Sequence, residues 1–231
     1  GYPPGNDKDA FGTVAAVVMT GGKVTKCQVL SPKLSLKGSF AHYAQTVAIG
    51  GMVGSIRGTG SVIDSKVDGG SIVNPETMTI SNVNLYVGGL CGQMEATSNM
   101  SDCGTKDVTV TFDNTKYNWE GDNARTKFAV GGVIGDIMKP ASNMPERVLS
   151  YNAKIKAKDA FVGPVVGCFS STNYNSGVIA NDYSGEGNDG GDLTKTGTWM
   201  YNGYKVHVNE KLINDMGRRK NYTALGDDGY L

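Results

Sequence analysis

Two aspartates stand at matching places of two similar segments, 38 residues apart: Asp64 in Val-Ile-Asp-Ser-Lys-Val and Asp102 in Met-Ser-Asp-Cys-Gly-Thr. Two carboxylates at roughly 5–10 Å are the arrangement that hydrolyses glycosidic bonds. In the other similar segments this place holds Lys26, Ser150 and Ala180. Such a mixed column favours an outward-facing, solvated position. The alternative is a carbohydrate-active enzyme that uses carboxylates on one face of the fold.

Histidine and cysteine offer little for catalysis or metal binding. The chain has two histidines and four cysteines, without a Cys-x-x-Cys pair: His42, His207, Cys27, Cys91, Cys103 and Cys168. A zinc site of the usual ligand spacing is therefore not indicated. We expect the cysteines to be buried thiols that act as small apolar residues, and two disulfides are the alternative. The sequence predicts a non-enzymatic protein with no metal and no cofactor.

The segment 114–123 is the best candidate for ligand binding. It places Tyr117 and Trp119 among asparagines and ahead of Asp122. Aromatic rings combine a large apolar face with a polar edge, and they can stack on the apolar faces of sugars while amides and carboxylates bind hydroxyl groups. We therefore name Tyr117, Trp119 and Asp122 as candidate ligand-binding residues. The alternative is a loop whose rings pack on the protein as a lid.

Composition excludes two classes of partner. The chain has 22 Lys plus Arg and 22 Asp plus Glu, so its formal charge is zero. Nucleic acids and anionic membranes are bound by clustered positive charge, which this balance does not favour. The longest apolar run covers residues 14–19, far below the ~18 residues of a membrane-spanning helix. Hydrophobic residues make up 39% of the chain, enough to form a core.

A glycine-rich octet that recurs along the chain is the strongest pattern. It reads IGGMVGSI at 49–56, VGGLCGQM at 87–94, VGGVIGDI at 130–137 and VGPVVGCF at 162–169, with a degenerate copy, FGTVAAVV, at 11–18. Its second positions are separated by 38, 38, 43 and 32 residues. A fixed period of this size is typical of solenoids and propellers. The glycines to which we assign a structural role are Gly50, Gly51, Gly54, Gly88, Gly89, Gly92, Gly131, Gly132, Gly135, Gly163 and Gly167.

Stacked strands explain this pattern. In a solenoid each strand lies about 4.8 Å from its own copy, and a crowded column of side chains favours glycine. Short strand-like segments follow each octet, such as 24–29, 62–67, 100–105, 148–153 and 178–183, and a third set includes 34–37, 78–80, 108–112 and 154–157. We predict an all-β fold: a right-handed parallel β-helix of about five repeats. The alternative is a propeller- or prism-like array of three-stranded repeats.

The octet, followed by Val-x-x-Cys or Val-x-x-Ser, resembles the GLUG-type repeat of large bacterial surface and secreted proteins. The resemblance covers residues 11–185 and departs at Thr13, Ala16 and Pro164. It implies an extracellular or cell-surface β-solenoid that acts in adhesion, with glycans or host and cell-surface proteins as partners. It brings no catalytic residues. A purely structural spacer domain is a further alternative.

Segments outside the repeats complete the expected organisation. Residues 1–10 form a polar, turn-like start that lacks the apolar stretch of a signal peptide, and 11–185 form the solenoid. Residues 186–231 form a glycine-rich linker and a cap, and the turn region predicted at 183–192 spans the boundary between the solenoid and this linker. Asn202-Gly203 between aromatic runs predicts a hairpin, and 209–217 predicts a short helix.

Overall fold

The computed structural model describes residues 8–38, 40–118, 128–138, 145–151, 153–163, 165–170, 179–186, 200–201 and 204–205, which form strands and no helix. The first coil contains β1 (Lys8–Gly12), β2 (Ala15–Val18), β3 (Lys23–Thr25), β4 (Gln28–Leu30) and β5 (Lys33–Ser35). The second contains β6 (Phe40–Gly50), β7 (Val53–Ile56), β8 (Ser61–Ile63), β9 (Lys66–Asp68) and β10 (Ser71–Val73). The third contains β11 (Met78–Gly88), β12 (Cys91–Met94), β13 (Asn99–Ser101), β14 (Gly104–Lys106) and β15 (Thr109–Phe112).

The fourth coil is less regular. It contains β16 (Thr115–Asn118), β17 (Phe128–Gly131), β18 (Ile134–Met138) and β19 (Leu149–Tyr151), and the long strand β20 (Lys154–Gly163) leads out of it. The start of β20 pairs with β15 and its end pairs with β17, so one strand closes the fourth coil and opens the fifth octet. The chain continues through β21 (Val166–Ser170) and β22 (Ile179–Glu186).

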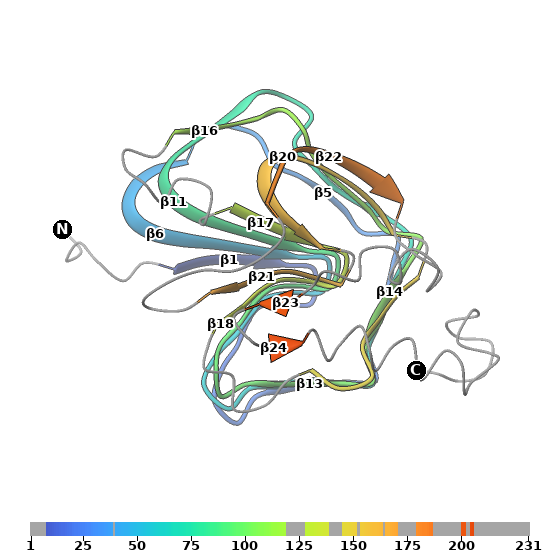
Figure 1. Cartoon of the computed structure of the whole chain (residues 1–231). Coiled ribbons are helices and arrows are strands. Elements are labelled where there is room, and N and C mark those ends of the chain that lie inside the picture. The colour runs from blue at the N-terminus through green and yellow to red at the C-terminus, as the bar shows by residue number, and fades with distance from the viewer. Residues whose placement is uncertain are drawn as a thin grey trace.

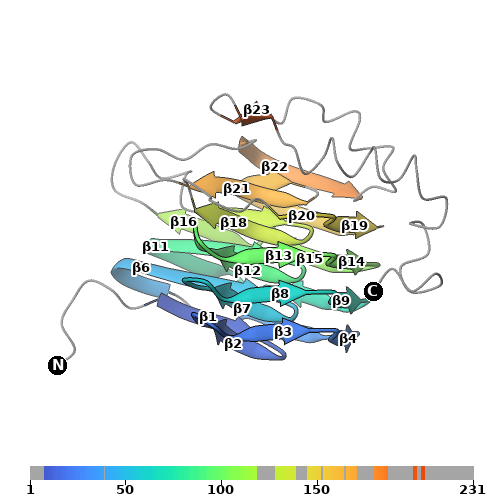
Figure 2. The same cartoon turned by 90° about the horizontal axis from the view of Figure 1, so that it is seen from below.

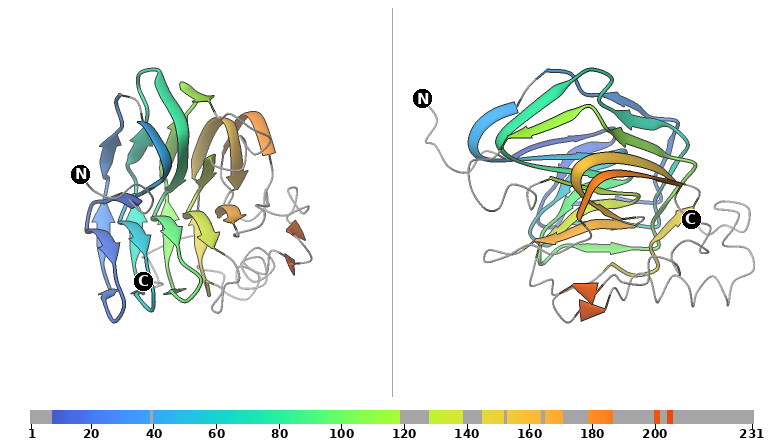
Figure 3. Two further views of the ribbon diagram at one scale, coloured as in Figure 1. Left: turned by 90° about the vertical axis from the view of Figure 1, so that its left-hand side faces the viewer. Right: turned by 45° about the horizontal axis from the view of Figure 1, so that its top comes forward.

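The coils stack in parallel register, as predicted. Gly12 pairs with Gly50, Gly50 with Gly88, Gly88 with Gly131 and Gly131 with Gly163. Figure 2 shows the coils one above another, from β2, β3 and β4 to β21 and β22, and Figure 3 shows the same stack from its side. The second sheet runs linearly, β2-β7-β12-β18-β21, and its ends do not pair. The fold is a parallel β-solenoid, and the closed, propeller-like alternative is wrong.

Each octet folds back into the interior of its coil. Along the stack, β6, β11 and β17 cross the middle of the outline, and the strands that follow them return underneath (Figure 1). The bend of the fold-back reaches the opposite wall: a Cβ on Gly89 would lie 3.0 Å from Cγ2 of Thr105 in β14. The Thr105 hydroxyl also donates a hydrogen bond to the Gly132 carbonyl oxygen, at 3.0 Å. The octets therefore divide the interior between two lobes.

Space, not backbone conformation, requires the octet glycines. None of them has a positive φ, whereas five other glycines among the described residues do. A Cβ on Gly88 would lie 2.0 Å from the Cys91 carbonyl oxygen on the returning strand, and one on Gly92 would lie 2.2 Å from the backbone nitrogen of Ile49 in the coil before it. Contacts this short with backbone atoms leave no room for a side chain. The columns of small residues thus arise from crowding between stacked coils, as predicted. The returning strand of the same coil adds a second source of crowding.

The structure explains why the first copy carries Ala16 where later copies carry glycine. Each later glycine at this place faces the backbone of the preceding coil: a Cβ on Gly54 would lie 2.4 Å from the backbone nitrogen of Phe11. Ala16 lies in β2, which is the terminal strand of its sheet and pairs with β7 of the second coil. No coil of the described residues lies below it, so a methyl group fits.

Three sequence-based expectations about strands are wrong. The closing strand of the second coil is β10, while 78–80 begin the long strand β11 of the next coil. The segment 178–183 does not continue the parallel stack, because β22 pairs antiparallel with β20. Within 183–192, Tyr183–Glu186 belong to that strand and are not a turn.

The tail is described only at its hairpin. β23 (Met200–Tyr201) and β24 (Tyr204–Lys205) pair antiparallel, which confirms the hairpin that Asn202-Gly203 predicts. The predicted helix 209–217 and Pro164, where the fourth full octet departs from the repeat, lie outside the described residues. Among the described residues, no helix is long and apolar enough to cross a membrane.

Candidate functional site

The predicted ligand-binding segment is only partly described. Thr115–Asn118 form strand β16 and pair in register with the start of β11, so this part is not a loop. The backbone of Tyr117 pairs with Ile80, whose own side chain is fully buried. Trp119 and Asp122 lie outside the described residues. The assignment of Tyr117, Trp119 and Asp122 to ligand binding stays a prediction.

The aspartates of the mixed column do lie side by side. Ser101 pairs with Ile63, so the next residues, Asp102 and Asp64, are neighbours in adjacent coils. They lie at the bends between β13 and β14 and between β8 and β9. Lys26, Asp64, Asp102 and Arg147 all have φ between 50° and 54°, the left-handed conformation that ends each of these short strands. They form one column, which we call the corner column. Ser150 and Ala180 do not belong to it, in contrast to the sequence-based alignment.

Register explains that correction. Ser101 forms a bridge with Glu146 and Gly104 pairs with Leu149, which sets Arg147 beside Asp102. Ser150 instead pairs with Thr105 on the inner face. The sequence carries a weak signal of this register, because Asp102-Cys103 and Arg147-Val148 are both a charged residue followed by a buried one. The varied length of the fourth unit concealed it.

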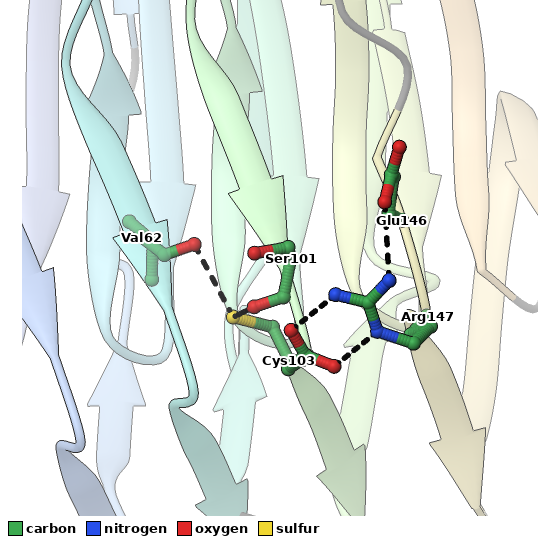
Figure 4. Close-up of polar contacts among 6 residues, drawn as sticks. Val62, Ser101, Cys103, Glu146 and Arg147 are labelled. Carbon is green, nitrogen blue, oxygen red and sulfur yellow. Dashed lines mark hydrogen bonds and ion pairs between the residues drawn. The ribbon is translucent and has the colours of Figure 1, made fainter.

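An ion pair dominates the upper corner column (Figure 4). The Arg147 guanidinium donates from Nε to Asp102 Oδ1 and from Nη2 to Asp102 Oδ2, the latter at 2.5 Å. Its Nη1 donates to Glu146 Oε2 at 3.1 Å. The hydrogen bonds to Asp102, more than any other cause, raise the pKa of Arg147 above its usual value. Both Asp102 oxygens are therefore engaged by a fixed cation, which opposes a role as general acid or nucleophile.

A second group of polar side chains lies where the strands of the octets return. Ser55, Gln93 and Asp136 occupy the same octet position in three coils and are buried. Gln93 Nε2 donates to Asp136 Oδ2 at 2.9 Å, whereas Gln93 Oε1 has no hydrogen-bond partner. The fifth octet has Cys168 there, and it packs with Tyr86, Ala129 and Phe161 in a small cluster separate from the main core. Ser55, Gln93 and Asp136 are therefore interior side chains that pack between neighbouring strands of the stack, and they do not form a surface site.

The cysteines are free, and three of them are buried as expected: Cys91, Cys103 and Cys168. Burial raises the pKa of Cys103 to about 12 and that of Cys91 further. Thiols held in the neutral form are poor nucleophiles and poor metal ligands. Cys27 is half-buried, in the first coil.

Comparisons with known proteins provide no relative. No family model, no curated protein and no solved structure matches this chain. The resemblance to GLUG-type repeats therefore stays a prediction. Among the described residues, no three His, Cys, Asp or Glu side chains are grouped as a metal site would need.

Proposed function

We propose that this chain is a non-enzymatic module of a bacterial surface or secreted protein, and that it acts in adhesion by binding glycans or host and cell-surface proteins. The observation that carries the proposal is the stack itself. Its walls repeat the same outward position from coil to coil, as in the column Lys33, Ser71, Thr109 and Lys154 on β5, β10, β15 and β20. Polar side chains at a spacing of about 4.8 Å suit a ligand that is itself a repeating chain.

The corner column weakens the enzymatic alternative. Asp64 and Asp102 are neighbours, but the Arg147 guanidinium engages both oxygens of Asp102. With both oxygens accepting hydrogen bonds from the guanidinium, this carboxylate is poorly placed to transfer a proton to a leaving group or to attack a sugar. The enzymatic alternative requires turnover of a polysaccharide that Asp64→Asn or Asp102→Asn abolishes. A purely structural spacer predicts no ligand.

A glycan array tests the proposal. Binding by the wild-type chain should fall roughly tenfold or more in Tyr117→Ala or Trp119→Ala, because a ring at the centre of an interface contributes more than 1 kcal/mol. Phe11→Ala is the control, since Phe11 is an exposed ring in the first coil, remote from β16 along the stack. Equal binding by all variants would remove these residues from the site. No binding by the wild type, on glycans and on cell surfaces, would contradict adhesion.

A further inference from the structure

The first coil leaves some of the apolar side chains at this end of the stack exposed. Phe11 is 48% exposed although its register partner Ile49 is 1% exposed. A pocket of about 330 Å³ opens here, and Phe11, Leu34, Leu36 and Ile49 supply its apolar lining. Its lining includes residues of β1 and β5, which are the two terminal strands of the ten-stranded sheet. An apolar pocket beside a free sheet edge is the arrangement that accepts an added strand.

Among the described strands, β5 pairs with β10 alone, so its other edge carries backbone groups that no described strand binds. The carbonyl oxygen of Pro32 accepts from Ser71, and the amide of Leu36 donates to Val73 on β10. Bonding residues alternate along a parallel strand, so the amides and carbonyls of Lys33 and Ser35 point away from β10, toward the open edge. An extended peptide beside β5 would pair with them.

Another coil of the same kind does not fit this edge. In every octet that has another coil below it, glycine occupies the position that Ala16 has in the first octet. Space requires this: a Cβ on Gly54, for example, would lie 2.4 Å from the backbone nitrogen of Phe11 in the coil below. The Ala16 methyl would meet a coil stacked in register in the same way. This excludes an in-register copy of the solenoid and leaves a single strand along β5.

Charge indicates the chemistry of that strand. Residues 8–38 contain five lysines and one acid, Asp9, although the whole chain is neutral. Lys23 and Lys33 lie at the edge, while their register partners in the second coil are Ser61 and Ser71. Both lysines are exposed and form no ion pair with the described residues. Lysines at an edge repel other basic edges and attract acidic ones.

We propose that the open edge of the first coil binds an acidic, extended polypeptide segment, which pairs with β5 and inserts an apolar side chain between Leu34 and Phe11. This interaction goes beyond the proposed adhesion function: it uses the end of the stack, and it shares only Lys33 with the wall column named there.

A labelled peptide, Glu-Val-Glu-Leu-Glu-Val-Glu, is the probe, and its fluorescence anisotropy is followed with the full chain. We expect saturable binding that weakens with salt. The Lys-Val-Lys-Leu-Lys-Val-Lys peptide should bind at least roughly tenfold more weakly, because its charges oppose those of the edge. A copy of the acidic peptide with N-methylated alternate amides should lose binding, since it cannot donate hydrogen bonds to β5.

Two double variants locate the site. Lys23→Glu with Lys33→Glu should weaken binding of the acidic peptide about tenfold and strengthen binding of the basic peptide. Lys106→Glu with Lys116→Glu, in the third and fourth coils, changes the net charge equally and should leave both affinities within about twofold. Equal effects of the two double variants, or equal binding of the N-methylated peptide, would overturn the proposal. So would self-association of the chain that the first double variant abolishes, because the occupant would then be a second copy.

Discussion

The first and second coils carry the same octet in the same register, yet their apolar side chains have different surroundings. Val14 is 48% exposed, whereas Met52, at the same octet position, is fully buried. Phe11 and Ile49 differ in the same way. The pattern of one coil therefore does not decide its burial; the coil on each side does. This is the behaviour of a repeat that cannot bury its apolar face alone.

Glycine and alanine show the same contrast at the sixth octet position. In the third coil a Cβ on Gly92 would lie 2.2 Å from a backbone nitrogen of the coil below, whereas in the first coil Ala16 carries its methyl group with no described coil beneath it. Strict glycine is thus a property of the interior of the stack. The first coil, which has no described coil below it, is released from the requirement, whereas Gly167 in the last octet is not.

The largest expected effect follows from this contrast. Gly92→Ala should destabilise the fold by at least about 3 kcal/mol, because the methyl group must displace the backbone of two strands, β6 and β7, in the coil below. Ala16→Gly should cost only about 1 kcal/mol, through the greater freedom of the unfolded chain. Urea unfolding followed by circular dichroism measures both. A Gly92→Ala protein as stable as the wild type would mean that the two coils are not packed as described.

A second pair of variants compares the first and second coils by truncating an apolar side chain in each. Ile49→Ala should cost about 3 kcal/mol, because it leaves a cavity in a fully packed column. Phe11→Ala removes a larger side chain, yet we expect about 1 kcal/mol, because Phe11 is half exposed at the end of that column. The same urea titrations apply. If Phe11→Ala were the more damaging of the two, the first coil would be covered in solution.

The glycine columns could be predicted from the sequence because the requirement is local and recurs at nearly constant spacing. Gly50, Gly88 and Gly131 align by eye, and the structure stacks them. The inward fold-back was not predicted, because apolar residues on both sides of a bend are equally consistent with an outer corner. Contacts between distant parts of the chain, such as the hydrogen bond from Thr105 to Gly132, distinguish the two.

The corner column shows where sequence reasoning failed. The fourth unit differs in length, so its alignment could slip by three residues, and Ser150 was placed where Arg147 lies. The antiparallel direction of β22 likewise has no local signal, because an isolated strand has the same pattern in either direction. Pairing partners decide both features.

The smallest expected effect concerns two cysteines of one column, which compare the exposure of the first coil with that of the third. Cys27 of the first coil and Cys103 of the third share a register position, with Ser65 between them, since Gln28, Lys66 and Gly104 pair in sequence. At pH 8 a thiol reagent should modify Cys27 in the native protein and leave Cys103 protected. Protection follows from burial, which raises the pKa of Cys103 to about 12.

The raised pKa also predicts how stability depends on pH. A thiol that resists ionisation in the folded state, but ionises near pH 9 when unfolded, contributes stability that is complete below pH 9 and is lost as pH rises toward 12. Between pH 8 and pH 10 the wild type should lose roughly 1 kcal/mol more than Cys103→Ser, in which the hydroxyl reproduces Ser65 of the neighbouring coil. Cys91 titrates in both proteins, so the difference isolates Cys103. Identical pH profiles would show that water reaches this thiol and that the third coil is no better covered than the first.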